Sequence, residues 1–202
     1  MGETMAQYAA VLDTCVLYGT LTRDLLLGSA EAGLFRPVWS AEILEELARS
    51  LVQGAGCTEE QLSHLTQCMN EAFPDAALSA PSELVASISR QLKDPDDAHV
   101  IATAVVAKAD AIITRNLEHF PDRVLEQYRL QAIGPDDFLV NQWDLEAKVM
   151  LKVALGCHAK LKKNSPNWAE WIGRLRKQGV GLHLFAARLE AARQSPEPAD
   201  EE

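Results

Sequence analysis

The chain has little of what marks membrane or exported proteins. Its longest uncharged apolar runs, such as residues 100–107, are far shorter than the roughly 18 to 20 residues of a membrane-spanning helix. Its first residues contain no cationic stretch followed by an apolar one and a cleavage site, so no signal peptide is expected. These features predict a cytoplasmic protein with no membrane partner.

Paired cysteines are also lacking. The chain has four cysteines, none in a C-x-x-C pair, which argues against a zinc knuckle and a disulfide framework. Cys157 and His158 are adjacent, but neighbouring side chains on a helix point about 100° apart, and no second pair completes a tetrahedral set of ligands. Reduced thiols are therefore expected.

The charge is distributed unevenly along the 202 residues, whose net charge is −10. Residues 1–140 carry 9 Lys and Arg against 21 Asp and Glu, whereas residues 141–194 carry 10 against 4. The basic segment therefore either binds an anionic partner or docks on the acidic part of the chain. Charge alone does not choose between the two.

The periodicity of apolar residues predicts an α/β fold. Strands are expected at residues 8–12, 34–39, 77–80, 110–114 and 130–133, and helices at 16–32, 41–51, 58–73, 82–92 and 98–108. Local signals support the helix starts: Ser40 as N-cap, a capping box from Thr58 to Gln61, and Asp94 as cap with Pro95 at the first position. Alternating strands and helices predict a three-layer α/β/α arrangement around a central parallel sheet.

The pattern after residue 138 is helical only. Helices are expected at about 143–162, 166–177 and 182–193, the second with Ser165 as cap and Pro166 at its first position. The chain therefore divides into an α/β domain at 1–140, a basic all-helical C-terminal extension at 141–194 and an acidic tail at 195–202, which is expected to be disordered.

Acidic residues stand where the predicted elements meet. Asp13 follows the first strand, Glu42, Glu45 and Glu46 lie on the helix after the second strand, and Asp94, Asp96 and Asp97 open the most apolar helix. Ligand groups gather where parallel strands end. The alternative is that the acids at 94–97 only cap a helix and that the glutamates face solvent. Asp13 is different, because a carboxylate beside a buried strand needs a partner or a metal ion.

Several segments together resemble PIN-domain ribonucleases, especially VapC-type toxins of toxin–antitoxin systems. They are residues 12–17 (LDTCVL), 39–47 (WSAEILEEL), 94–104 (DPDDAHVIATA), 109–116 (ADAIITRN) and 119–121 (HFP). The resemblance covers about residues 8–140. The helical segment from Phe138, including residues 181–189 (GLHLFAARL), is similar to the C-terminal extension of some larger VapC-like proteins.

The resemblance implies an endoribonuclease that depends on Mg2+ or Mn2+. Asp13, Glu46 and Asp97 match the metal-binding acids, and Asn116 stands where the family often has aspartate, so that it is a ligand or positions water. Hard cations take such oxygen ligands and leave positions open for water and phosphate. Supporting roles fall on the residues beside them, namely Thr14, Arg115, Asp94, Asp96 and Glu42. Alternatively, Thr14 is only a turn residue and Asn116 only a cap, and Arg115 pairs with a neighbouring acid. The metal-dependent mechanism does not require His99 or His119.

The implied partners are an RNA substrate and a cognate antitoxin, with a homodimer left open. Two basic clusters are candidate RNA contacts: Lys160, Lys162 and Lys163, then Arg174, Arg176 and Lys177. Both also suit helix C-termini. Trp168 and Trp171 are expected to pack rather than to stack on bases. The alternatives are an RNA-processing or DNA-flap nuclease without antitoxin, and a non-catalytic PIN-fold protein that binds RNA or a protein partner, to which Asn116 points.

Overall fold

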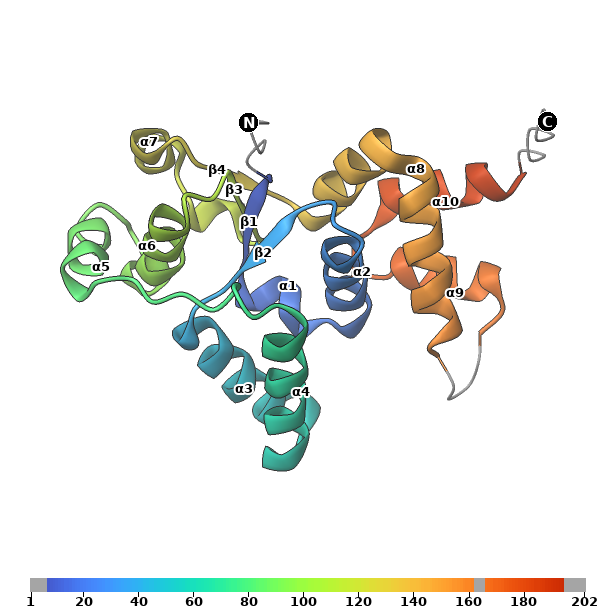
Figure 1. Cartoon of the computed structure of the whole chain (residues 1–202), viewed down its shortest axis with the longest axis horizontal. Coiled ribbons are helices and arrows are strands. Elements are labelled where there is room, and N and C mark those ends of the chain that lie inside the picture. Colours follow the sequence, from blue (N-terminus) through green and yellow to red (C-terminus); the bar gives the residue numbers. More distant parts are fainter. Residues whose placement is uncertain (1–6, 162–165, 195–202) are drawn as a thin grey trace, which may run out of the picture.

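A computed structural model describes residues 7–161 and 166–194 of the chain. Four parallel strands form one sheet in the order β2-β1-β3-β4 (Figure 1). The strands are β1 (Ala9–Leu12), β2 (Arg36–Val38), β3 (Ala111–Ile113) and β4 (Gln131–Ile133). Every residue of β1 is buried, as expected of an uninterrupted apolar strand in the middle of a parallel sheet.

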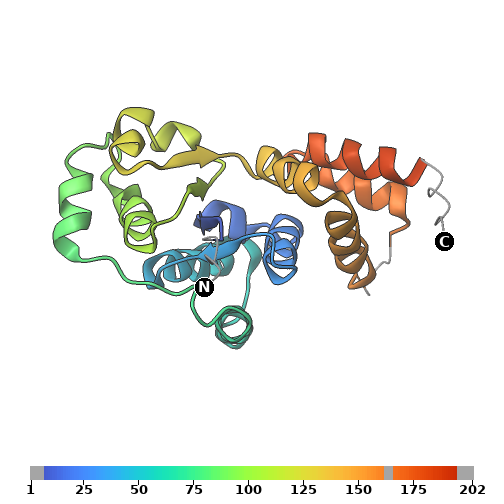
Figure 2. The ribbon, with the colours of Figure 1, turned by 45° about the horizontal axis from the view of Figure 1, so that its top comes forward.

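Helices cover both sides of this sheet. The helices up to β4 are α1 (Thr14–Tyr18), α2 (Thr20–Glu31), α3 (Ala41–Ala55), α4 (Glu59–Ala72), α5 (Ser82–Ser89), α6 (Ala98–Ala107) and α7 (Asp122–Leu125), with short 3-10 helices η1 (Pro95–Asp97), η2 (Leu117–His119) and η3 (Glu126–Tyr128). Helices α5 and α6 lie on one side and α2 on the other (Figures 1 and 2). The predicted three-layer α/β/α fold is therefore confirmed.

The C-terminal part is helical, as predicted. It consists of α8 (Pro135–Ala159), α9 (Trp168–Leu175) and α10 (His183–Gln194), and α8 packs against both α2 and α10. Figure 2 shows these three helices together beyond α2. The division proposed at residue 140 falls within α8, so one helix joins the two parts and the division stays a proposal. The tail at 195–202 lies outside the described residues.

Local signals placed several helix starts correctly. The Ser40 hydroxyl accepts a hydrogen bond from the Ile43 N–H, and Thr58 and Gln61 form the predicted capping box. The Asp94 carboxylate accepts from the Asp96 N–H, with Pro95 at the first position of η1. Each of these signals lies within one turn of the residue that it caps, which is why the sequence reveals it.

Other local predictions were wrong. Residues 77–80 form no strand, only an isolated parallel bridge between Trp39 and Ala77, because Pro81 ends the segment at once as the N-cap of α5. The helix expected at 16–32 is two helices, since Gly19 is extended (φ −78°, ψ 113°).

The predicted bounds of the C-terminal helices also need correction. Helix α8 begins at Pro135, directly after Gly134, and has a non-helical residue at Glu146 (φ −144°, ψ 67°). Helix α9 begins at Trp168, because the Asn167 side chain supplies the cap and pairs with Glu170 in a capping box. Ser165, the predicted cap, lies outside the described residues. None of the described helices is long and apolar enough to cross a membrane.

Candidate active site

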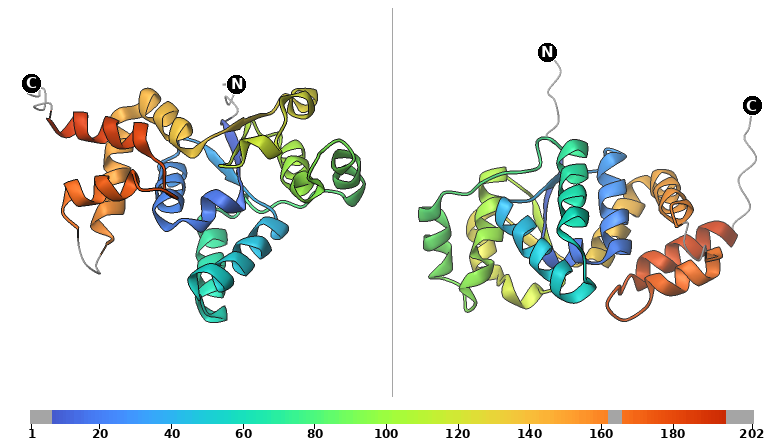
Figure 3. Two further views of the ribbon diagram at one scale, coloured as in Figure 1. Left: turned by 180° about the vertical axis from the view of Figure 1, so that it is seen from behind. Right: turned by 90° about the horizontal axis from the view of Figure 1, so that it is seen from below.

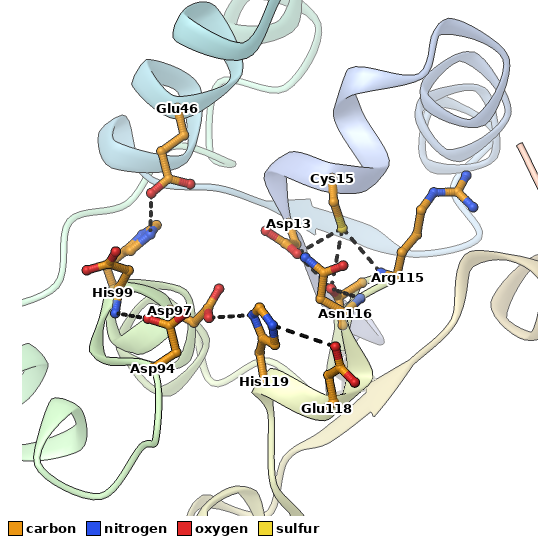
Figure 4. A network of polar contacts seen from close by, with 12 residues as sticks. Asp13, Cys15, Glu46, Asp94, Asp97, His99, Arg115, Asn116, Glu118 and His119 are labelled. Carbon is orange, nitrogen blue, oxygen red and sulfur yellow. Dashed lines mark hydrogen bonds and ion pairs between the residues drawn. The ribbon is translucent and has the colours of Figure 1, made fainter. Parts of the chain in front are cut away.

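Asp13 stands at the centre of the candidate site, at the carboxyl end of β1. Its N–H donates to the Ile113 carbonyl (3.1 Å), so the ends of β1 and β3 are fixed side by side. The side chain is almost completely buried, and its Oδ2 accepts hydrogen bonds from the Thr114 hydroxyl (2.6 Å) and the Cys15 thiol (2.9 Å). Both donors hold the same oxygen, and Figure 4 shows the contact from Cys15. The other oxygen, Oδ1, has no hydrogen-bond partner among the described residues and is available to a cation.

Cys15 was not predicted to take part in the site. Burial raises the pKa of its thiol, the charge of Asp13 adds to this, and the pKa reaches about 12. The side chain therefore remains a protonated donor to Asp13 at neutral pH, while its sulfur accepts the Arg115 N–H (3.2 Å). Its contribution is to orient the carboxylate. The sequence showed only a cysteine beside Asp13, with no sign that it turns back onto the carboxylate.

Glu46 reaches the site from α3. The Thr14 hydroxyl donates to one carboxylate oxygen (2.9 Å), and His99 Nε2 lies 3.0 Å from the other. Burial raises the pKa of Glu46, but the hydrogen bond and charge of His99 and the bond from Thr14 outweigh it, so the pKa lies below its ordinary value. Glu42 and Glu45 on the same helix are exposed. The structure thus brings Glu46 to the site and leaves Glu42 in solvent.

Asp97 ends η1 and faces Asp13 from the opposite side of the site. His119 Nδ1, on η2, lies 2.9 Å from Asp97 Oδ2 (Figure 4). Burial raises the pKa of Asp97, the charges of Asp13 and Asp94 raise it further, and His119 opposes them without cancelling the shift. Burial and the two neighbouring acids thus both disfavour the charged form of this carboxylate.

The two histidines are the main residues that sequence reasoning left out. His99 and His119 contact Glu46 and Asp97, which are 53 and 22 residues away along the chain. Burial lowers the pKa of His99, but its bond to Glu46 and the charges of Glu46 and Glu42 raise the pKa above its ordinary value. No motif at fixed spacing signals such pairs, because they depend on how α3, α6 and η2 pack.

A group of three possible metal ligands lies beside the main site. Among the described residues, Asp94, Asp97 and His119 have ligand atoms that all lie within 4.8 Å of one another. Asp94 also caps η1, the alternative role that the sequence left open for it, and Asp96 is exposed. Asp13 and Glu46 do not belong to this group.

Arg115 and Asn116 follow β3 and differ in their contacts. The Arg115 guanidinium donates to the Thr22 hydroxyl on α2 (2.7 Å). Asn116 is exposed; its N–H donates to the Thr114 hydroxyl (3.0 Å), and its side chain makes no capping bond to η2. The capping alternative for Asn116 therefore has no support from this geometry.

One cleft of about 750 Å³ contains most of these groups. Its lining includes Asp13, Thr14, Cys15, Tyr18, Gly19, Glu46, Ser50, Gln53, Gly54, Asp97, Arg115, Asn116 and Gly179. Among these described residues are three carboxylates and one guanidinium. Carboxylate oxygens on separate elements suit a hard divalent cation, so the donor set fits Mg2+ or Mn2+.

The members of the two basic clusters that the structure describes do not line this cleft. Lys160 and Lys177 are exposed. The two terminal nitrogens of Arg176, Nη1 and Nη2, donate to the Glu190 carboxylate (2.8 and 2.6 Å). Arg174 is half-buried, and Lys162 and Lys163 lie outside the described residues.

The two tryptophans of α9 contribute to packing, as expected. Their rings lie 5.0 Å apart, and both contact the ring of His158. Trp171 is fully buried and Trp168 is partly exposed.

Comparison with known families and proteins agrees with this architecture. The family described as PIN domain matches residues 9–118, and the family described as VapC50 C-terminal domain matches residues 135–191. A relative from Mycobacterium tuberculosis (strain ATCC 25618 / H37Rv), "Putative ribonuclease VapC50", is 37% identical over 99 residues, which cover 44% of this chain and 57% of that protein. The match thus spans little more than half of the relative's length. No solved structure matches the chain significantly.

Proposed function

The chain belongs to the PIN-domain family, and from that membership we propose that it is an endoribonuclease that depends on a divalent metal ion. The observation that carries the proposal is the cleft itself, whose lining includes carboxylates from the end of β1, from α3 and from η1. Such a cleft repels RNA unless a cation balances its charge. We therefore expect the cleft to bind a phosphate of RNA only together with a cation.

Asp13, Glu46 and Asp97 are the proposed ligands of Mg2+ or Mn2+. A divalent ion bound there lowers the pKa of a water molecule and stabilises negative charge on the phosphate. The residues around the ligands orient them: Thr114 and Cys15 hold Asp13, Thr14 and His99 hold Glu46, and His119 holds Asp97. Partners of this kind commonly tune the ligands of a metal site.

Asn116 and Arg115 complete the proposed site. The Asn116 amide is neutral, so it serves as a weak ligand or orients water, and the site carries one carboxylate fewer than with aspartate there. Arg115 lines the cleft and contacts a phosphate of the substrate, since a guanidinium matches phosphate geometry. Both assignments follow from their position in the cleft.

The biological role that we propose is that of the toxin in a toxin–antitoxin pair, acting on RNA in the cytoplasm. The support is the similarity to the M. tuberculosis protein named "Putative ribonuclease VapC50", together with the match of residues 135–191 to the VapC50 C-terminal domain. Growth arrest on expression without an antitoxin, relieved by Asp13→Asn, is the expected outcome. Equal toxicity of the variant would point to aggregation or to binding without cleavage.

Cleavage of labelled single-stranded RNA with Mg2+, Mn2+ or EDTA tests the chemistry. Glu46→Gln is expected to lower kcat at least about 100-fold, the order of effect of losing a charge that acts on the reacting groups. Glu45→Gln is the matched control on the same helix, because Glu45 is exposed. Its activity is expected to stay within about twofold of the wild type.

The product ends distinguish the mechanisms. Attack by water leaves a 5'-phosphate and a 3'-hydroxyl, whereas attack by the neighbouring 2'-hydroxyl leaves a 2',3'-cyclic phosphate. Cyclic ends, or full activity in excess EDTA, would contradict a metal-dependent hydrolase. Tight RNA binding without cleavage in either metal would favour the non-catalytic alternative.

A further inference from the structure

The connection between α9 and α10 reaches the catalytic cleft although it lies far along the chain. Gly179 lines the same cleft as Asp13, Glu46 and Asp97. We refer to residues 176–182 as the α9–α10 turn. Figure 3 shows this connection running beside α1 and α2, which agrees with the presence of Tyr18 and Gly19 in the same cleft lining. The C-terminal extension thus contributes part of the cleft surface.

The turn is a fixed structure. The N–H groups of Val180 and Gly181 both donate to the Lys177 carbonyl (3.0 Å each), and the Leu182 N–H donates to the Leu175 carbonyl (2.9 Å). Gly179 has φ +89° and Gly181 has φ +62°, a region that glycine enters without strain. The backbone therefore has a defined path past the cleft.

A carboxylate from the start of α8 fixes the helix that follows the turn. Asp136 accepts hydrogen bonds from the N–H groups of Leu184 (2.8 Å) and Phe185 (2.9 Å), 48 and 49 residues later in the sequence. These are among the first N–H groups of α10, which have no partner within the helix. Because α8 starts directly after β4, this contact ties the turn to the edge of the sheet.

Arg115 connects the turn to the catalytic residues. A Cβ atom added to Gly181 would lie 3.6 Å from Arg115 Nη1, so the guanidinium lies against the turn. Its Nη2 donates to Thr22 on α2. The guanidinium is thus held between α2 and the turn, at the border of the cleft.

The turn also differs in charge from the rest of the cleft. The lining contributed by the end of β1, α3 and η1 includes three carboxylates, whereas Gly179, the residue of the turn in that lining, is uncharged. Lys177 and Gln178, which precede it, are exposed. The charge of Arg176 is balanced by Glu190. A strand of RNA carries a phosphate at every nucleotide, so the phosphates that flank the reacting one need a wall that does not repel them.

We propose that the α9–α10 turn is an RNA-positioning wall of the cleft and that the C-terminal extension acts through it in substrate binding. This inference rests on the proposed nuclease function. In it, the carboxylates take the cation at the reacting phosphate, and the turn and Arg115 hold the neighbouring part of the strand. The turn is a positioning element and takes no part in the chemical step.

A charge placed on the turn tests the proposal. A Cβ atom at Gly179 would meet nothing within 4 Å, so Gly179→Glu places a carboxylate in open cleft space. Gly33→Glu is the matched control, because Gly33 has a similar φ (+83°), equally open surroundings and no place in this cleft. Both variants carry the same backbone strain and the same change of charge.

Binding is measured by fluorescence anisotropy of a labelled single-stranded RNA with Mn2+, each variant combined with Asp13→Asn so that cleavage does not interfere. Gly179→Glu is expected to raise Kd about tenfold at low salt, and less at high salt because ions screen the repulsion. In the cleaving protein, KM is expected to rise by a similar factor with kcat within about twofold. A purely structural defect would instead lower kcat through a smaller active fraction.

The outcomes separate this inference from the proposed function. Equal Kd values for Gly179→Glu and Gly33→Glu, with normal cleavage by the wild type, would overturn the inference alone. A wild type that binds RNA but does not cleave it would overturn the nuclease proposal, while the anisotropy comparison would still test the wall. If Gly179→Glu does not fold, Gly179→Asp against Gly179→Asn replaces it, because these two residues have the same shape, enter positive φ more readily than most others and differ by one charge. Equal Kd values for those two would overturn the inference.

Discussion

Replacing Asp136 with alanine removes the contact that fixes the start of α10. The carboxylate accepts two N–H groups at 2.8 and 2.9 Å, as a helix cap does, but from a distant element. Removing a capping side chain costs about 0.5 to 2 kcal/mol, and hydrogen bonds to charged groups lie at the upper end of such values. We therefore expect Asp136→Ala to lower the free energy of unfolding by about 2 kcal/mol. For a chain of this length, that loss corresponds to a fall in Tm of about 4 to 8 °C.

The adjacent Asp137 provides the control. It is exposed and lies in the same first turn of α8, so Asp137→Ala loses the same interaction with the dipole of α8 but no contact with α10. That interaction contributes roughly 0.3 to 1 kcal/mol. Thermal and urea unfolding of the two variants isolate the contact, and hydrogen exchange at Leu184 and Phe185 localises it. Equal Tm values, with unchanged exchange at these two amides, would refute the reasoning.

Two further predictions concern the catalytic cleft. Folding raises the pKa of Asp97, so the charged form of its side chain destabilises the protein at neutral pH. In EDTA at pH 7, Asp97→Asn should therefore have a higher Tm than the wild type, and the difference should shrink as pH falls and the wild-type carboxyl is protonated. The Tm of this variant should not rise on addition of Mn2+. A variant less stable in EDTA that keeps the full Mn2+ shift would contradict this ligand assignment. Because burial and Asp13 raise the pKa of Cys15 to about 12, its thiol is protonated at pH 8 and should not react with iodoacetamide, whereas the exposed Cys68 should react. Peptide mass spectra measure the modification of each cysteine. Rapid labelling of Cys15 would disprove its orienting contact with Asp13.

The sequence predicted those features whose cause is local. An apolar run followed by Asp13 located a buried strand and the acid at its end. The helical period of residues 41–51 puts Glu42 opposite the apolar face and Glu46 at its edge, and in the structure Glu42 is exposed and Glu46 is half-buried. A cap and the helix that it starts are neighbours in the chain, so Ser40 and Thr58 could be recognised without knowledge of the fold.

The features that sequence reasoning missed depend on packing between distant elements. His99 meets Glu46, and Asp136 meets the start of α10, only after the helices have docked. Their residue types carry no information about the partner, since a histidine on an apolar helix is usually part of the core. The strand predicted at residues 77–80 is wrong for the opposite reason. The short apolar pattern is typical of a strand, but of these residues only Ala77 pairs with another segment, in the bridge to Trp39.

The uneven charge of the sequence acquires a structural meaning from these contacts. The sequence left open whether the basic segment binds an anion or docks on the acidic part of the chain. Asp136 bonds to N–H groups of α10, and the charge of Arg176 is balanced by Glu190 within the extension itself. These contacts are therefore not ion pairs between basic side chains of residues 141–194 and acidic side chains of residues 1–140. Lys177 is exposed two residues before Gly179, which lines the cleft. The contacts that dock the segment thus leave Lys177 free of the ion pair that Arg176 makes, so docking on residues 1–140 and the proposed binding of an anion do not compete for the same side chains.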